Sequence, residues 1–338
     1  MVHPIARRRV TSRPGLPKAL KYSAAVMFGV AIGAFFTSIN TIDSKDHVSS
    51  LVLQESVMQT THNGFHPIHV YYGSEDAIKG LSASSLQMKQ HYNAGSQVDQ
   101  DKIISALVSL YATKESSHIP HAPFFIDLAA NDAVQLSNTL YLEKVGWQGI
   151  CIEPNPIYWY RLAHRKCTVA AAFVGAEDMQ QVDVSLQNEE YGGIVAAGMD
   201  NKVSKRSKTT EKRYTISLKT LFQEFHVPQT VDYLSLDVEG AEHLIMKDFP
   251  FAAYAIRFIT IERPKPDLQK LLKANGYIFV MQLIFWGETL WVHESVLQTL
   301  SMDEIQQSVR KTSKYPAQVP GKNALVFDLK TGVYSVAS

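Results

Sequence analysis

Short apolar segments that end in acidic residues recur from residue 124 onward, and they constrain the fold more than any other feature. Four such segments alternate with stretches whose apolar residues have helical spacing. Short strands and helices that alternate in this way are typical of a parallel sheet with right-handed crossovers. The four segments are residues 124–128, 149–153, 231–237 and 256–262. We therefore predict a doubly wound α/β domain.

Other patterns extend this domain over residues 97–335. A helix is expected before the first strand, a third strand between the second and fourth segments, and an antiparallel strand pair near the end. Expected helices are 99–113, 137–144, 157–164, 218–225, 241–247, 267–274 and 301–308, and the additional strands are 168–174, 182–186, 277–283 and 289–292.

The acids at the strand ends predict a ligand site. Open α/β sheets bind ligands outside the carboxyl ends of their strands, where the strand order reverses. A single acid at a strand end is often only a helix cap. Four acids on four strands indicate a shared cleft instead, and these acids are Asp127, Glu153, Asp237 and Glu262.

Spacing suggests roles for the first two acids. Asp127 opens a turn over residues 127–133, which brings backbone N–H groups and a helix N-terminus close to a bound ligand. Glu153 ends the next strand, where an acid holds ribose hydroxyls in dinucleotide-type folds. These features alone fit NAD as well as S-adenosylmethionine.

Three motifs together resemble the FkbM family of methyltransferases. They are FIDLAANDA followed by LSNT within residues 125–139, GICIEPNP at 149–156, and YLSLDVEGAE at 233–242. Residues 96–101, SQVDQD, are similar to a lead-in segment of the membrane-anchored, Star-like branch. The resemblance covers residues 96–295. It implies a class I methyltransferase (Rossmann-like) sheet, S-adenosylmethionine, and methyl transfer to an oxygen of a sugar or other small hydroxylated acceptor.

The resemblance also implies roles for single residues. The turn after the first strand would face the methionine part of the cofactor, and the acid of the second strand would hold the ribose. The matching acidic motif at the fourth strand contains Asp237, Glu239 and Glu242. The expected cofactor-binding residues are Asp127, Ala129, Asn131, Ser137, Glu153 and Asn155.

The first turn departs from a glycine-rich methyltransferase turn. Ala129, Asn131 and Ala133 stand where small glycines would be expected. Alanine takes positive φ only at a cost, whereas asparagine tolerates that region better. A degenerate, non-catalytic domain is therefore the alternative to an enzyme.

Methyl transfer to an alcohol needs a group that accepts the hydroxyl proton. We predict Asp237 or Glu239 as the general base, with Glu262 at the adjacent strand end as the third catalytic residue. A second hypothesis is that Asp237 and Glu262 hold a divalent cation that orients the acceptor hydroxyl.

The N-terminal residues predict a membrane anchor. Residues 1–21 carry Arg and Lys but no acid, and residues 22–39 contain no charged residue. Eighteen residues of helix span about 27 Å, enough for a hydrocarbon core. The basic flank favours a cytoplasmic N-terminus, so we expect a single-pass protein of the ER or Golgi, with residues 40–96 as a stem.

Three alternatives and one additional pattern accompany this anchor. A cleaved secretory signal, an organelle-targeting peptide and a buried soluble helix are the alternatives, although no charge interrupts the run. Gly29 and Gly33 form a GxxxG pair that could support a homodimer.

The charge balance of the chain bears on whether it binds nucleic acid. The net charge of +1 gives no bias toward nucleic acid.

Cys151 and Cys167, the two cysteines, lie in apolar runs, so we expect buried free thiols. Trp286 lies in a predicted loop, where it either packs the last strands or stacks on a sugar.

Three functions remain open. The first is a membrane-anchored O-methyltransferase that acts on a small-molecule or glycan acceptor. The second is a non-enzymatic trafficking or binding protein with the same domain. The third is an NAD-dependent enzyme, although no G-x-G-x-x-G motif occurs.

Overall fold

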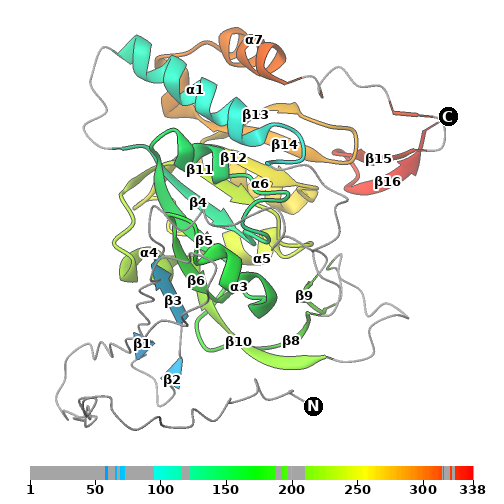
Figure 1. Ribbon diagram of the computed structural model, residues 1–338. Coiled ribbons are helices and arrows are strands. Elements are labelled where there is room, and N and C mark those ends of the chain that lie inside the picture. The colour runs from blue at the N-terminus through cyan, green and yellow to red at the C-terminus, as the bar shows by residue number, and fades with distance from the viewer. Residues whose placement is uncertain are drawn as a thin grey trace, which may run out of the picture. The chain divides into compact units, whose positions relative to one another are not determined.

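An eight-stranded, mostly parallel sheet forms the centre of the computed structural model (Figure 1). Its strand order is β13-β14-β12-β11-β4-β5-β6-β3. Five neighbouring strands run parallel: β6 (Thr168–Ala171), β5 (Gln148–Ile152), β4 (Phe124–Leu128), β11 (Thr230–Leu236) and β12 (Ala255–Glu262). The predicted parallel core is confirmed. The order reverses at β4, between β5 and β11, as a site at the carboxyl ends requires.

The structure describes residues 58–59, 65–66, 69–72, 95–115, 122–186, 192–196, 199, 210–313, 315, 320–321 and 324–337. The predicted anchor at 22–39, its GxxxG pair and most of the predicted stem lie outside these residues. Within the described part of the chain, no helix combines the length and apolarity needed to cross a membrane.

Both ends of the sheet carry antiparallel strands. β14 (Glu288–His293) lies between β12 and β13 (Tyr277–Gln282) and runs antiparallel to both. At the other end, β3 (His69–Tyr72) pairs antiparallel with β6. The final strand pair was predicted. β3 was not, because it falls in the predicted stem and only four residues mark it.

Helices cover both faces of the sheet, which confirms the doubly wound arrangement. One core cluster joins the sheet to α1 (Gln100–Glu115), α2 (Leu140–Lys144), α3 (Pro156–Leu162) and α7 (Met302–Thr312). The other joins it to α4 (Leu218–Glu224), α5 (Glu242–Met246) and α6 (Pro266–Ala274). Neighbouring β4 residues face opposite clusters, Phe125 one and Ile126 the other, so the strand is apolar on both sides.

Helix boundaries follow local capping. Residues 137–144 were predicted as one helix, but α2 begins only at Leu140; in the segment before it, the Ser137 hydroxyl accepts a hydrogen bond from the Leu140 N–H (3.1 Å). The last helix begins at Met302 after a capping box between Ser301 and Glu304.

A second, four-stranded sheet has the order β7-β10-β8-β9. The expected strand 168–174 is divided into β6 and β7 (Phe173–Gly175), and β7 pairs with β10 (Glu211–Ser217) instead of continuing in the central sheet. β8 (Gln181–Ser185) matches the alternating segment predicted there, and β9 is Gly193–Ile194. The smaller elements are β1 (Met58–Gln59), β2 (Phe65–His66), η3 (Glu294–Gln298), β15 (Leu325–Asp328) and β16 (Val333–Val336).

The prediction of free thiols was wrong. Cys151 of β5 and Cys167, just before β6, form a disulfide with a Cα–Cα distance of 5.9 Å. Both side chains are buried. The α3 crossover returns the chain beside β5, and this places Cys167 next to Cys151. Sequence reasoning missed the bond because spacing alone does not show whether two cysteines come close enough to bond.

Removing this disulfide should destabilise the domain. The two cysteines are 16 residues apart, and a loop of about this length gains about 3 kcal/mol from a disulfide. Urea unfolding of the Cys151→Ala/Cys167→Ala variant should show that loss, and dithiothreitol should lower the wild-type midpoint without moving the variant's. A wild-type midpoint indifferent to reductant would contradict the bond.

Candidate functional site

A cavity of about 310 Å³ lies at the carboxyl ends of β4, β5, β11 and β12. All the predicted catalytic and cofactor-binding residues line it except Ser137. Its other lining residues come from loops and from elements distant in sequence. The lining is Gln97, Gln100, Asp127, Ala129, Ala130, Asn131, Leu136, Asn138, Glu153, Pro154, Asn155, Tyr158, Gly192, Asp237, Val238, Glu239, Glu262, Arg263, Trp286 and Tyr334.

Glu153 is the acid at the end of β5, and only 4% of its surface is exposed. Its Oε2 accepts a hydrogen bond from the Asn131 N–H and its Oε1 accepts one from the Asn155 N–H, both at 2.7 Å. Burial raises the pKa of Glu153 to about 7, although these two N–H groups favour its charged form. A carboxylate has about four lone-pair sites, so two remain for hydroxyl groups of a ligand.

Asp127 is also buried, at the end of β4. Burial raises the pKa of its carboxyl group. The nearby charge of Arg165 and hydrogen bonds from Thr139 and Ser235 oppose this increase. Asn138 donates to the Ser235 hydroxyl (3.0 Å). Asp127 therefore lines the cavity while its oxygens are already engaged by the protein.

Ser137 does not line the cavity. Its hydroxyl accepts a hydrogen bond from Arg165 Nη1 (2.8 Å), and Arg165 also contacts Thr139 and Glu143. Ser137 and Arg165 have no exposed surface. The predicted cofactor contact of Ser137 is thus replaced by a structural one, in a network that holds the segment between β4 and α2.

Left-handed backbone conformations gather at this cavity. Ala129 has φ of 63° and Asn131 has φ of 53°, so the turn adopts the strained conformation without glycine. Leu136, Glu239 and Arg263 also have positive φ and also line the cavity. A non-glycine residue pays about 1–2 kcal/mol for this region. Such strain gathers at sites where tight backbone geometry serves a ligand.

Three further acids meet beside the β11 and β12 ends. Asp237, Glu239 and Glu262 each offer a carboxylate oxygen within 4.8 Å of the others. Arg263 Nη2 donates to Glu239 Oε2 (3.0 Å) and also pairs with Glu262. The guanidinium therefore neutralises two of the acids that could otherwise share a divalent cation.

Protons are distributed unevenly among these acids. Burial and the neighbouring Glu262 raise the pKa of Asp237 well above its usual value. Burial raises the pKa of Glu262 to about 7, against the favourable charge of Arg263. The hydrogen bond between the two carboxyl groups raises the pKa of Asp237 and lowers that of Glu262, so a proton shared by the pair is favoured on Asp237. Asp237 Oδ1 is buried without a partner among the described residues.

Glu242, the last acid of the fourth-strand motif, does not reach the cavity. Its Oε1 accepts hydrogen bonds from the Val238 N–H (3.3 Å) and the Gly240 N–H (2.9 Å). It holds the turn that presents Asp237 and Glu239.

Sequence reasoning missed several lining residues. Arg263 directly follows a predicted acid, and that position was the only signal for it. Gln97, Gln100 and Tyr158 lie on or beside predicted helices without a distinguishing pattern. Tyr334 belongs to the β15–β16 hairpin, which the sequence did not predict.

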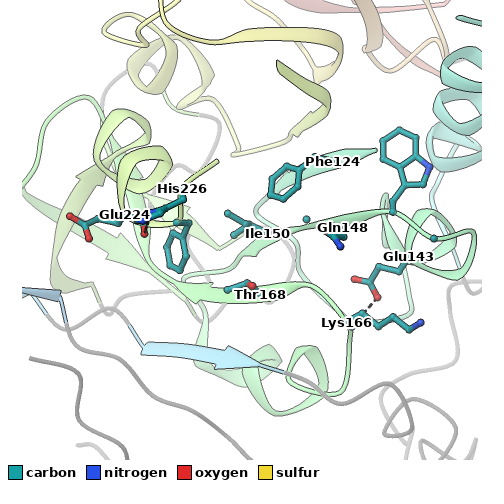
Figure 2. A pocket seen from close by; sticks show the side chains of 12 residues that line it. Phe124, Glu143, Gln148, Ile150, Lys166, Thr168, Glu224 and His226 are labelled. Carbon is teal, nitrogen blue, oxygen red and sulfur yellow. Dashed lines mark hydrogen bonds between the residues drawn. The ribbon is translucent and has the colours of Figure 1, made fainter. Parts of the chain in front are cut away.

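A larger hollow of about 590 Å³ lies at the opposite edge of the sheet (Figure 2). Phe124, Gln148 and Thr168, which begin β4, β5 and β6, line it together with Glu224 and His226. It contains none of the predicted site residues. Ligands of this architecture bind at the carboxyl ends, so we assign the functional site to the smaller cavity.

Comparison with protein families identifies the domain. Residues 127–279 match the family model of the methyltransferase FkbM domain, so the chain contains an FkbM methyltransferase domain. The match begins at Asp127 and ends within β13, and it includes every predicted site residue. A comparison with curated proteins found no match to the chain.

The buried acids should make the domain less stable as pH rises. Burial and Asp237 raise the pKa of Glu288, the first residue of β14, to about 8, whereas its unfolded value is 4.5. Between these values the folded state holds more protons than the unfolded state, so the free energy of unfolding falls as pH increases. Glu153 and Glu262 act in the same direction up to about pH 7.

Thermal melting measured between about pH 5 and pH 8.5 tests this expectation. The melting temperature should fall across that range, and Glu288→Gln should reduce the fall and raise the value at the alkaline end. Glu224→Gln, an exposed change in α4, is the control. A wild-type melting temperature that rises over this interval would show that these acids are not buried as described.

Proposed function

We propose that this FkbM methyltransferase domain catalyses S-adenosylmethionine-dependent methylation of a hydroxyl group on a small or glycan acceptor. One observation carries the proposal. A buried acid suited to a ribose, Glu153, and a hydrogen-bonded acid pair suited to proton transfer, Asp237 and Glu262, line the same cavity.

The residues present fit S-adenosylmethionine. The cavity volume lies at the lower end of the range for small-molecule sites, about 300–1,000 Å³. Glu153 would hold the ribose hydroxyls through its two free lone-pair sites. Asp127 and the turn of Ala129 and Asn131 would lie along the methionine part, and the acidic lining favours a positively charged sulfonium.

The bound cofactor would supply an activated methyl group. On transfer to the acceptor oxygen, that methyl group would leave the electron pair of the carbon–sulfur bond on sulfur. The hydroxyl proton passes to Glu262. The pKa of Glu262, about 7, suits a base that works near neutral pH. We propose that Asp237, whose pKa is raised, holds the shared proton and positions Glu262. Glu262 is then the proposed base in place of Asp237 or Glu239, which the sequence suggested.

A divalent cation is the alternative for orienting the acceptor. Asp237, Glu239 and Glu262 could ligate it with carboxylate oxygens. Arg263 would first have to release Glu239 and Glu262. We therefore propose that Arg263 supplies the positive charge that such an ion would otherwise bring.

A non-catalytic binding protein is the second candidate function. Ala129 in a glycine-like conformation is the observation that favours it. The presence of the hydrogen-bonded pair Asp237 and Glu262 favours an enzyme over a binding protein, because a protein that only binds ligands has no need of a buried proton acceptor.

The Cys151–Cys167 disulfide supports the proposal that the domain lies in an oxidising compartment. The lumen of the secretory pathway is such a compartment. This placement fits the anchor proposed from residues 22–39, with a cytoplasmic N-terminus.

Glu153→Gln should weaken S-adenosylmethionine binding by about 10- to 100-fold, since hydrogen bonds to a charged group contribute about 1.5–3 kcal/mol. Wild-type affinity should also fall as pH drops below about 7, because the carboxylate form holds the ribose. Isothermal titration calorimetry measures both, and Glu224→Gln is the control. Unchanged affinity in Glu153→Gln would refute the ribose contact, and tight NAD binding instead would favour the alternative of an NAD-dependent enzyme.

Glu262→Gln should lower kcat by about 100-fold or more, the usual contribution of a general base. Asp237→Asn should lower it as well, and cofactor affinity should be retained in both. Transfer of a radiolabelled methyl group to a pool of neutral glycans gives the rate, which in wild type should rise with pH through about 7. Normal turnover by Glu262→Gln would refute its role, and cofactor binding without any wild-type transfer would favour the non-catalytic protein.

A further inference from the structure

The C-terminal hairpin contributes to the wall of the candidate site. β15 and β16 lie beyond residue 279, where the FkbM match ends. Tyr334 of β16 nevertheless lines the cavity, together with Trp286 from the loop between β13 and β14. The family domain alone therefore does not complete this cavity.

Specific contacts hold the hairpin against that loop. The Phe327 N–H donates to the Phe285 carbonyl (2.9 Å), and the Tyr334 hydroxyl donates to the Trp286 carbonyl (3.1 Å). The Phe327 and Tyr334 rings pack edge to face with their centroids 5.5 Å apart. Phe327 is buried, so the hairpin is fixed through an apolar anchor as well as through hydrogen bonds.

Gly287 brings this aromatic wall next to the catalytic acids. It has φ of 120°, and a Cβ there would lie 2.8 Å from Arg263 Cγ and 3.0 Å from Phe327 Cδ1. The Arg263 N–H donates to the Gly287 carbonyl (2.9 Å). Arg263 in turn pairs with Glu262. Trp286 directly precedes Gly287, which contacts Arg263, and Arg263 pairs with the proposed base Glu262.

The lining has the chemistry of a carbohydrate site. Trp286 is partly buried, and its ring packs edge to face on Phe285 with the centroids 5.1 Å apart, which fixes its plane. Aromatic faces stack on the C–H-bearing face of a pyranose ring, and carboxylates accept hydrogen bonds from its hydroxyls.

The acidic side chains of the lining disfavour anionic acceptors. Five carboxyl groups line the cavity, those of Asp127, Glu153, Asp237, Glu239 and Glu262, and Arg263 is the one Lys or Arg among its lining residues. The single guanidinium is already engaged by Glu239 and Glu262, so an acceptor with a phosphate or carboxylate group would find no free cation among these lining side chains and would face further carboxyl groups in a partly dehydrated site. A neutral, hydroxyl-rich acceptor meets no such penalty.

We propose that Trp286 and Tyr334 form the acceptor subsite and select a neutral pyranoside. This inference rests on the proposed function, because it assigns the acceptor of the same cavity. Specificity then depends on a hairpin that lies outside the family domain, whereas Glu153 and Glu262 serve the transfer itself.

Saturation-transfer NMR on the full chain with S-adenosylhomocysteine tests the subsite. The probes are methyl β-D-galactopyranoside and methyl α-D-mannopyranoside, with methyl β-D-glucuronide and galactose 6-phosphate as their anionic counterparts. At least one neutral glycoside should bind, and the anionic sugars should not. Trp286→Ala and Tyr334→Ala should weaken that binding by about tenfold, as expected for loss of one aromatic contact.

Matched variants separate stacking from folding. Tyr334→Phe keeps the ring and should retain most of the binding, whereas Tyr214→Ala removes a comparably exposed tyrosine far along the sequence in β10 and should change nothing (50% exposed, against 40% for Tyr334). Melting curves identify any variant that does not fold. If Trp286→Ala fails to fold, Trp286→Phe together with Tyr334→Ala carries the test.

The remaining outcomes are distinct. Binding of S-adenosylhomocysteine without any neutral glycoside, equal binding of anionic sugars, or glycoside binding unaffected by Trp286 and Tyr334 would each overturn the subsite while leaving the proposed function intact. If calorimetry shows that neither S-adenosylmethionine nor S-adenosylhomocysteine binds the wild-type chain, the proposed function fails and this inference fails with it.

Discussion

Acidic side chains are held out of bulk water at one edge of the central sheet, and the cost of their burial governs the site. A buried carboxylate is stable only when it is neutralised, protonated or given hydrogen-bond donors. Each solution is used here. Glu153 receives two backbone N–H groups, Glu239 pairs with Arg263, and the pKa of Asp237 is raised well above its usual value, which favours its protonated form. In the proposed function, these differences in environment give chemically similar groups different roles, one for a ribose and another for a proton.

A second buried network fixes the strands that carry these acids. Thr139 joins Asp127 to Arg165, and Arg165 joins Thr139 to Glu143. Glu143 accepts hydrogen bonds from the N–H groups of Lys166 and Cys167, and Cys167 is bonded to Cys151 in β5. The chain of contacts thus runs from the site to the disulfide. Buried ion pairs add little net stability but are costly to break, so this network favours one arrangement of β4, β5 and β6.

The remaining side of the site is built from segments that are less constrained by the sheet. The β13–β14 loop and the C-terminal hairpin meet at Gly287, where only glycine leaves room for both Arg263 and Phe327. Variation in these segments would leave the acids of β4, β5, β11 and β12 in place. In the proposed function, transfer chemistry and acceptor choice therefore belong to different parts of the chain.

The sequence by itself determined the kind of fold and the edge of the sheet that carries the site. Apolar periodicity specified the parallel strands and most helices, and because parallel strands end at one edge, it placed Asp127, Glu153, Asp237 and Glu262 together. Only the tertiary structure decided that Ser137 faces Arg165, that the cysteines are bonded, that Arg263 neutralises Glu239 and Glu262, and that the hairpin brings Tyr334 to the cavity. These features depend on contacts between residues far apart in sequence, which leave no periodic pattern, whereas strands and helices are encoded by their near neighbours.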